Sequence, residues 1–296
     1  KYAPNMMELA SRDVVSRSEQ TEINEGRGID GCVLLDARHL GEKLINERLS
    51  QIRQLGIDFA GKDLVTDPVP IRPGMHYIMG GIKTDMDGLT SIPGLYAAGE
   101  TACVSVHGGN RLGANSLLDT LVFGRRSGQH ASEWVKNQSS ALVDDSYLNT
   151  DREAIQNLLN RDTGEMFGQI RLNLGQTMNK HLAVYRDQKG MEQAKSDLAE
   201  LKNRYSSVIV QDKNKIFNTN LIFTIELGFM LDCAETTIIG ALERKESRGA
   251  HTRTDMPDRD DKNWLKHIVV SQIDGKPKVD YLPVNITKWQ PQERKY

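Results

Sequence analysis

The sequence predicts a chain of mixed α/β and α structure with regions of different character. Glycines crowd together with short apolar segments between residues 76 and 135, which is typical of backbone that packs closely against something. Residues 150–245 carry amphipathic helical patterns, and an Asp-Gly pair separates two β-rich runs near the C-terminus. These three observations predict a glycine-rich α/β part, an antiparallel helical bundle and a small β-containing end. The mixed helix, turn and strand signals of residues 1–75 add an α+β beginning.

The composition excludes several classes of function. The formal charge is -2 over 296 residues, with 26% charged side chains, so nothing favours a nucleic-acid partner. The sequence has no apolar run near the roughly 20 residues of a membrane helix, so membrane association would come through a partner. The three cysteines form no CxxC pair, so we expect no metal site.

The first 75 residues mix helical and turn signals. Apolar residues at helical spacing predict a helix over residues 39–55. A turn leads into a strand across residues 29–35. The proline-rich stretch 67–73 predicts an extended crossing between two domains rather than a secondary-structure element.

The glycine-rich part contains a short strand and the start of a helix. Residues 95–98 predict the strand, which ends at Gly99 and Glu100. The helix starts at Asn115, with Ser116 as the expected N-cap. One face of this helix is apolar and carries Leu117, Leu118, Leu121 and Val122.

The last two parts are predicted from helical periodicity and turn chemistry. Residues 150–245 carry four apolar stripes separated by polar loops, which predicts antiparallel helices in a bundle. The Asp274-Gly275 pair lies between two β-rich runs and predicts a hairpin.

One segment has the composition of an anion site. Arg111 lies among glycines and small residues directly before a helix N-terminus. Its planar fork matches a carboxylate, and the helix end adds positive potential. The alternative is a glycine-rich turn with a solvated arginine. His76 also has two interpretations, a ligand at a domain junction or a structural histidine. Arg12, from spacing alone, is a charged residue on the outer face of a helix.

Several motifs together resemble one family. These are His76-Tyr-Ile-Met-Gly-Gly, Gly94-Leu-Tyr-Ala-Ala-Gly-Glu100, His107-Gly-Gly-Asn-Arg111-Leu-Gly-Ala-Asn115-Ser116-Leu117-Leu, Arg12-Asp-Val-Val, Glu25-Gly-Arg-Gly and Lys245-Glu-Ser-Arg-Gly-Ala-His251. Taken in their order along the chain, from Lys1 to Tyr296, they resemble the C-terminal half of the succinate dehydrogenase/fumarate reductase flavoprotein subunits. Gly109 replaces the alanine expected from that family.

The resemblance implies an FAD enzyme that interconverts succinate and fumarate by hydride transfer between substrate and flavin N5. Arg12 would exchange the proton, and His76 and Arg111 would bind the substrate carboxylates. The residues implied to contact FAD are Glu100, Asn115, Ser116 and Leu117.

The resemblance also implies an architecture and partners. Residues 1–75 would be the remainder of a capping domain, 76–140 the closing part of a Rossmann-like FAD domain, 141–245 the helical bundle and 246–296 the β-containing end. The implied partners are an iron–sulfur subunit and a membrane anchor with quinone. The implied location is the membrane periphery, on the cytoplasmic side of a bacterial inner membrane or the matrix side in mitochondria.

The flavin fingerprint of that family is expected upstream of Lys1, since no GxGxxG lies between a strand and a helix here. We therefore expect this polypeptide to need the N-terminal half of the flavoprotein for FAD binding and turnover. Two alternatives stay open: an L-aspartate oxidase-like flavoenzyme, and a non-catalytic fragment or assembly module.

Overall fold

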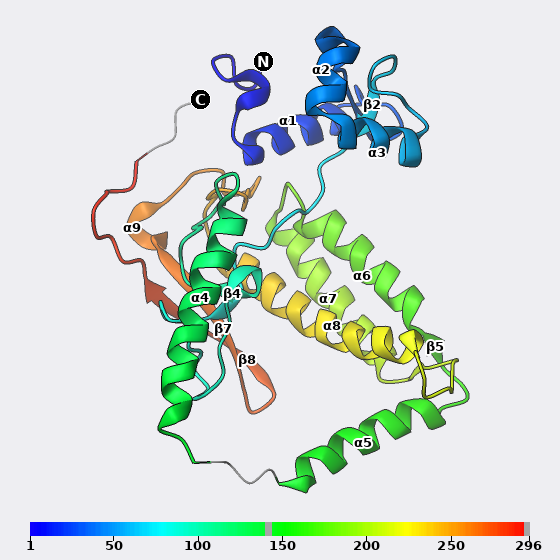
Figure 1. Cartoon of the computed structure of the whole chain (residues 1–296), viewed down its shortest axis with the longest axis vertical. Helices are drawn as coiled ribbons and strands as arrows, with labels where there is room; N and C mark the ends of the chain where they lie inside the picture. Colours follow the sequence, from blue (N-terminus) through cyan, green and yellow to red (C-terminus); the bar gives the residue numbers. More distant parts are fainter. Residues whose placement is uncertain (140–143, 293–296) are drawn as a thin grey trace. The chain divides into compact units, whose positions relative to one another are not determined.

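The computed structural model describes residues 1–139 and 144–292. The chain divides into two compact units, one made of Lys1–His76 with the C-terminal residues from Gln290, the other of Tyr77–Trp289. Figure 1 shows the helices and small sheets along the chain. The mixed fold class predicted from the sequence is confirmed, and the finer division into four regions stays a prediction.

The first unit contains a small sheet that the sequence predicts only in part. Strand β1 (Val33–Leu35) is confirmed, and it pairs antiparallel with β2 (Val69–Ile71). The prediction of a crossing without secondary structure at residues 67–73 is therefore wrong. Pro70 faces Leu34 in this pair. Proline has no N–H to donate, but both strands of a two-stranded sheet are edge strands, where a missing donor is tolerated.

The helix predicted over residues 39–55 is two helices. They are α2 (Gly41–Arg48) and α3 (Ser50–Ala60), and Leu49 between them has φ -128 and ψ 22, outside the helical region. Gly61 ends α3 in the left-handed conformation, as is usual for a C-terminal glycine. The unit also contains η1 (Met7–Leu9), α1 (Arg12–Asn24) and η2 (Arg38–Leu40).

The second unit opens with very short strands. β3 (Ile82–Lys83) pairs parallel with β4 (Ala102–Cys103), which follows η3 (Gly99–Thr101). The strand predicted at residues 95–98 is wrong, because this segment makes only an isolated bridge from Tyr96 to Leu89. The backbone turns at Gly94 before a regular ladder can form.

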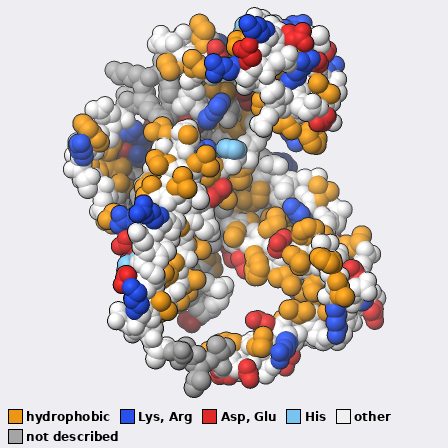
Figure 2. Space-filling view, viewed as in Figure 1, with side chains coloured by type: hydrophobic (Ala, Val, Ile, Leu, Met, Phe, Trp, Pro, Cys, Tyr) orange, Lys and Arg blue, Asp and Glu red, His pale blue; other side chains and the backbone are white. Residues whose placement is uncertain are grey.

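Helix α4 (Asn115–Lys136) begins where the sequence predicts. Its N-cap is Ala114 in the left-handed conformation, with no capping side chain, so the prediction of Ser116 as N-cap is wrong. The apolar face of α4 is exposed: Leu117 is 71% and Leu121 72% accessible. Figure 2 shows hydrophobic side chains at the surface of the molecule in the region of α4.

The predicted bundle is present. Its helices are α5 (Asp145–Asn160), α6 (Phe167–Leu182), α7 (Gln188–Tyr205) and α8 (Thr219–Glu243), and α6, α7 and α8 pack on one another (Figure 1). Their shared core contains buried Ile170, Met191, Leu198, Leu227 and Ile238. Two short strands, β5 (Glu165–Met166) and β6 (Val208–Ile209), pair parallel beside it.

The C-terminal hairpin is also confirmed. After α9 (Asp261–Trp264), β7 (Lys266–Ile273) pairs antiparallel with β8 (Lys276–Pro283). Asp274 and Gly275 have φ values of 51 and 72, which the primed two-residue turn requires. Within the described ranges, no helix is both long and apolar enough to cross a bilayer.

Candidate active site

Arg111 lies in the loop between β4 and α4, and its charge has no ion-pair partner in the part of the chain that the structure describes. The guanidinium lies over the Tyr77 ring at 4.7 Å from the centroid, and Nη1 donates to the Leu112 carbonyl at 3.1 Å. Its Nε is buried without a hydrogen-bond partner in the described part of the chain. No carboxylate among residues 1–139 and 144–292 forms an ion pair with it. A cation in this state is suited to bind an anion from outside the chain.

Next to Arg111, half-buried Tyr77 forms a polar cluster with the buried side chains of His107 and Asp119. The Tyr77 hydroxyl donates to Asp119 Oδ2 at 3.2 Å, and it lies 3.3 Å from His107 Nε2. His107 Nε2 and Asp119 Oδ2 are 3.1 Å apart, with side chains 6% and 4% exposed. Burial, followed by the hydrogen bond to Asp119, raises the pKa of Tyr77. His107 Nδ1 is buried and has no partner among the described residues.

The sequence did not predict this cluster. His107 lies within the recognised motif but had no role, and Asp119 was one polar residue in a helix with an apolar face. One signal was available: Asp119 follows Asn115 by four residues, so both lie on the same face of α4.

The start of α4 carries the residues expected to contact FAD. Asn115 and Ser116 open the helix, and Leu117 follows with an exposed side chain. The Asn115 N–H donates to the Leu112 carbonyl and the Leu117 N–H to the Ala114 carbonyl, both at 3.2 Å. No side chain caps this end, so the positive end of the helix dipole stays available to a negative group.

Glu100 lies beside this helix start. Its carboxylate is exposed and accepts a hydrogen bond from the Ile78 N–H at 3.0 Å. Gly99 has φ 75, and a Cβ built there would lie 3.2 Å from Thr120 Oγ1 on α4. The glycine therefore allows η3 to approach α4 closely, which places Glu100 near the helix that carries Asn115.

The other side of the arginine loop packs on the Lys245-Glu-Ser-Arg-Gly-Ala-His251 segment. The Ala250 N–H donates to the Gly109 carbonyl at 2.9 Å. Gly249 has φ 60, and a Cβ there would lie 2.1 Å from that same carbonyl oxygen. A Cβ on Gly109 would itself lie 3.1 Å from the Arg248 carbonyl. Gly249 is therefore required by close backbone packing, whereas a Cβ at Gly109 would be a tight contact. This packing holds the loop that carries Arg111.

Arg12 and His76 belong to the other compact unit. Arg12 is the first residue of α1 and is exposed, without a hydrogen-bond partner in the described ranges. On the same helix, burial raises the pKa of Glu19, and the charge of Arg12 opposes that rise. His76 is exposed at the end of its unit. The second unit thus brings Arg111 together with Glu100 and the start of α4.

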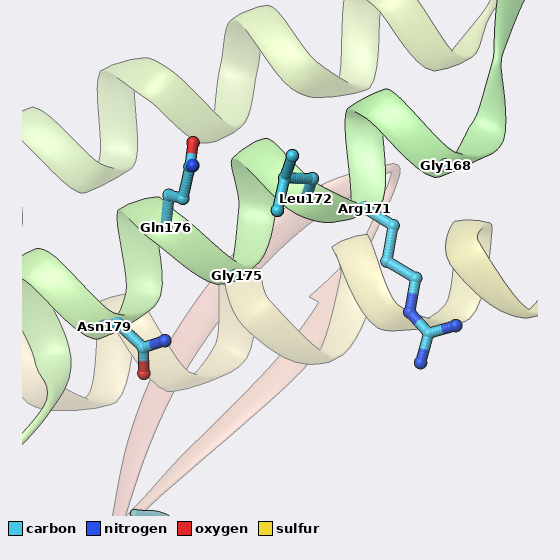
Figure 3. A pocket seen from close by; sticks show the side chains of 6 residues that line it. All are labelled: Gly168, Arg171, Leu172, Gly175, Gln176 and Asn179. Carbon is cyan, nitrogen blue, oxygen red and sulfur yellow. The ribbon is translucent and has the colours of Figure 1, made fainter. Parts of the chain in front are cut away.

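The surface also has a shallow depression on α6, away from these residues. Figure 3 shows the six residues that line it, all from that one helix: Gly168, Arg171, Leu172, Gly175, Gln176 and Asn179. The depression forms because Gly168 and Gly175 have no side chains to fill this part of the helix surface. None of the site residues predicted from the sequence is among them.

Comparison with known proteins gives the chain its family. Residues 3–117 match a family described as an FAD-binding domain, and residues 171–296 match the fumarate reductase flavoprotein C-terminus. A fumarate reductase flavoprotein subunit of Haemophilus influenzae is 41% identical over 98% of this chain and 50% of its own length. A succinate dehydrogenase flavoprotein subunit of Rickettsia conorii is 40% identical over 97% of this chain and 51% of its own length.

Solved structures agree. A quinol fumarate reductase of E. coli superposes with a TM-score of 0.92 at 40% identity, over 97% of this chain and 51% of that chain. A Mycobacterium smegmatis Sdh1 complex gives 0.80 at 33% identity, over 95% and 48%. The chain therefore spans about half the length of the relatives it matches. It belongs to the fumarate reductase and succinate dehydrogenase flavoprotein family.

Proposed function

We propose that this chain is part of an FAD-dependent enzyme that interconverts succinate and fumarate. The observation that carries the proposal is Arg111, a guanidinium without a carboxylate partner in the described chain, beside the uncapped start of α4. A dicarboxylate supplies the negative groups that this site lacks. The names of the relatives, fumarate reductase and succinate dehydrogenase flavoprotein subunits, support the same reaction.

The residues around Arg111 fit a flavin. Two buried polar atoms, Arg111 Nε and His107 Nδ1, have no partner in the described chain, and buried polar groups normally have one. Glu100, Ser116 and Leu117 would hold FAD near the start of α4, with Asn115 close by. When bound, FAD supplies the two-electron acceptor. The positive helix end would stabilise negative charge that develops there.

We propose that Arg111 and His76 each bind one carboxylate of the substrate. Arg111 offers a bidentate fork, and His76 offers a ring N–H. This would orient the central carbon–carbon bond toward the cofactor and hold it there.

We propose Arg12 as the residue that exchanges the proton with the substrate. A guanidinium has a pKa above about 12 and donates a proton more readily than it removes one. Fumarate reduction therefore uses Arg12 directly. Succinate oxidation needs a carboxylate near Arg12 to carry the proton away.

The proposed assembly follows the relatives. An E. coli quinol fumarate reductase and a related structure solved with menaquinol molecules have a flavoprotein chain of this fold. We propose that the present protein passes electrons to an iron–sulfur subunit and then to a membrane anchor with quinone. It would lie at the membrane periphery, on the cytoplasmic or matrix side. FAD binding would require the part of the flavoprotein that this chain does not span.

An absorbance experiment tests the proposal. The flavoprotein that contains this chain is purified whole, and its visible spectrum is recorded before and after addition of succinate. A flavin band that bleaches with succinate supports the proposal, and Arg111→Gln should abolish the bleaching while the band persists. A band that bleaches with L-aspartate and not with succinate would contradict the proposal and favour an L-aspartate oxidase-like enzyme. Absence of flavin from the whole protein would leave a non-catalytic module.

A further inference from the structure

Tyr77 provides the surface on which the Arg111 side chain lies. We propose that Tyr77 is a positioning residue for Arg111, and that buried His107 and Asp119 hold Tyr77 in place for this role. The inference rests on the proposed function, since it assigns these residues a part in dicarboxylate binding. Tyr77 does not touch the reacting atoms in this account and acts through Arg111.

The first step concerns what holds Arg111. Its guanidinium has two contacts in the described structure, the Leu112 carbonyl at 3.1 Å and the face of the Tyr77 ring at 4.7 Å. An arginine over an aromatic face is attracted by the ring quadrupole. Among the described residues the guanidinium makes one hydrogen bond, from Nη1 to the Leu112 carbonyl, so donors remain for a carboxylate. The ring therefore orients the fork without competing with the ligand.

The second step concerns what holds Tyr77. Its hydroxyl lies between Asp119 Oδ2 and His107 Nε2, at 3.2 and 3.3 Å. The rings of Tyr77 and His107 meet edge to face, with centroids 5.4 Å apart and planes at 89°. Rotation of the tyrosine would break hydrogen bonds to buried groups, which is unfavourable because those groups would be left unsatisfied. The ring orientation is thus fixed by two other segments of the chain.

The third step links this cluster to ligand affinity. A side chain that is already ordered before binding loses less conformational freedom when the ligand arrives. Removal of the ring should therefore weaken dicarboxylate binding more than it lowers the rate at which bound substrate is converted. Tyr77 also directly follows His76, the other proposed carboxylate ligand. Its attachment to Asp119 restrains the chain beside both ligands.

The experiment compares substitutions in the whole, FAD-loaded flavoprotein. Tyr77→Leu removes both the ring and the hydroxyl, and Tyr77→Phe keeps the ring and removes only the hydroxyl. Tyr96→Leu is a matched control, because the Tyr96 hydroxyl bonds His130 Nδ1 at 2.7 Å in a second tyrosine–histidine pair of the same unit that does not include Arg111. For each protein, KM and kcat for succinate, flavin content and a crystal structure are obtained.

We expect Tyr77→Leu to raise KM by about 3- to 30-fold, the range of a lost cation–π contact, with a smaller change in kcat. Tyr77→Phe should raise KM less, and Tyr96→Leu should leave it unchanged. The crystal structure of Tyr77→Leu should show a displaced Arg111 guanidinium. An unchanged KM in Tyr77→Leu, or an equal rise in Tyr96→Leu, would overturn the inference.

The two proposals can fail separately. If the unsubstituted, flavin-loaded protein does not oxidise succinate, the proposed function is wrong. The crystal structures then decide the positioning role alone: a displaced Arg111 in Tyr77→Leu supports it, and an unmoved guanidinium refutes it.

Discussion

Glu246 and Arg248 form a buried bidentate ion pair. Arg248 Nε and Nη2 donate to the two carboxylate oxygens at 2.7 and 2.9 Å, and the Glu246 side chain is fully buried. The same carboxylate also accepts from Arg244 Nη1 at 2.6 Å and from the Asp260 N–H at 2.8 Å. Because Arg248 packs against Gly109, this pair supports the loop that leads to Arg111.

Removal of that carboxylate should destabilise the fold strongly. Glu246→Ala leaves the partly buried Arg244 and Arg248 without their shared partner, although Arg248 keeps its ion pair with Asp261. Loss of one partner from a buried ion pair costs about 3–5 kcal/mol, and the remaining pair should keep the loss at the lower end. The measurement is the free energy of unfolding from urea denaturation. Glu133→Ala is the control, because Glu133 pairs with Lys136 on the exposed surface of α4 and should cost under about 1 kcal/mol. Similar losses in both variants would contradict the role of the buried carboxylate.

The stability of the protein should depend on His251 at acidic pH. Burial and the charges of Arg186, Arg244 and Arg253 lower the pKa of His251 to about 3. Its Nδ1 lies 2.9 Å from Arg186 Nη1, so the neutral ring accepts this hydrogen bond. Between pH 3 and the ordinary pKa of about 6.5, the unfolded chain binds a proton that the folded protein does not.

Stability should therefore rise with pH across that window and level off above it. The slope from this one group is at most about 1.4 kcal/mol per pH unit. His251→Gln keeps an acceptor for Arg186 and should flatten the profile measured by urea denaturation at several pH values. His39→Gln, at an exposed position, is the control and should leave the slope intact. A profile unaltered by His251→Gln would refute the assignment.

The fork of Arg111 should matter more than its charge. Arg111→Lys keeps the charge and loses bidentate geometry. Loss of one charge-assisted hydrogen bond costs about 1.5–3 kcal/mol, so kcat/KM for succinate should fall by about tenfold to a hundredfold. Arg126→Lys is the control, because Arg126 is exposed and pairs with Asp87. Full activity in Arg111→Lys would show that a point charge is enough and would argue against a bidentate carboxylate contact.

The exposed face of α4 should be needed for flavin retention. Leu117 and Leu121 are apolar and accessible, and the relatives are about twice as long as this chain. We expect the rest of the flavoprotein to cover this face. Leu121→Glu should therefore lower the flavin content of the purified whole protein, measured by absorbance per chain. Leu172→Glu, at the exposed surface of α6, should not. Equal flavin content in the two variants would mean that this face of α4 is not buried in the whole protein.

The sequence alone determined the features that depend on local pattern. Apolar stripes predict the bundle helices because helical periodicity is read within about a dozen residues. Asp274-Gly275 predicts the hairpin because few residue pairs adopt two positive φ angles. Arg111 could be singled out from the sequence because its glycine neighbours and the following helix start lie within a few residues of it. The starts of α4 and the hairpin both lie where these rules place them.

The tertiary structure decided what depends on residues distant in sequence. Val69 and Ile71 form a strand only because β1 lies beside them. Tyr77 meets Asp119 across 42 residues, and no local spacing encodes that contact. In the sequence Glu246 is only one charged residue of the Lys245–His251 motif, yet it is buried, and two arginines and a backbone N–H satisfy its oxygens. Local propensity places each residue on its element, and only long-range packing and polar satisfaction determine which of them meet.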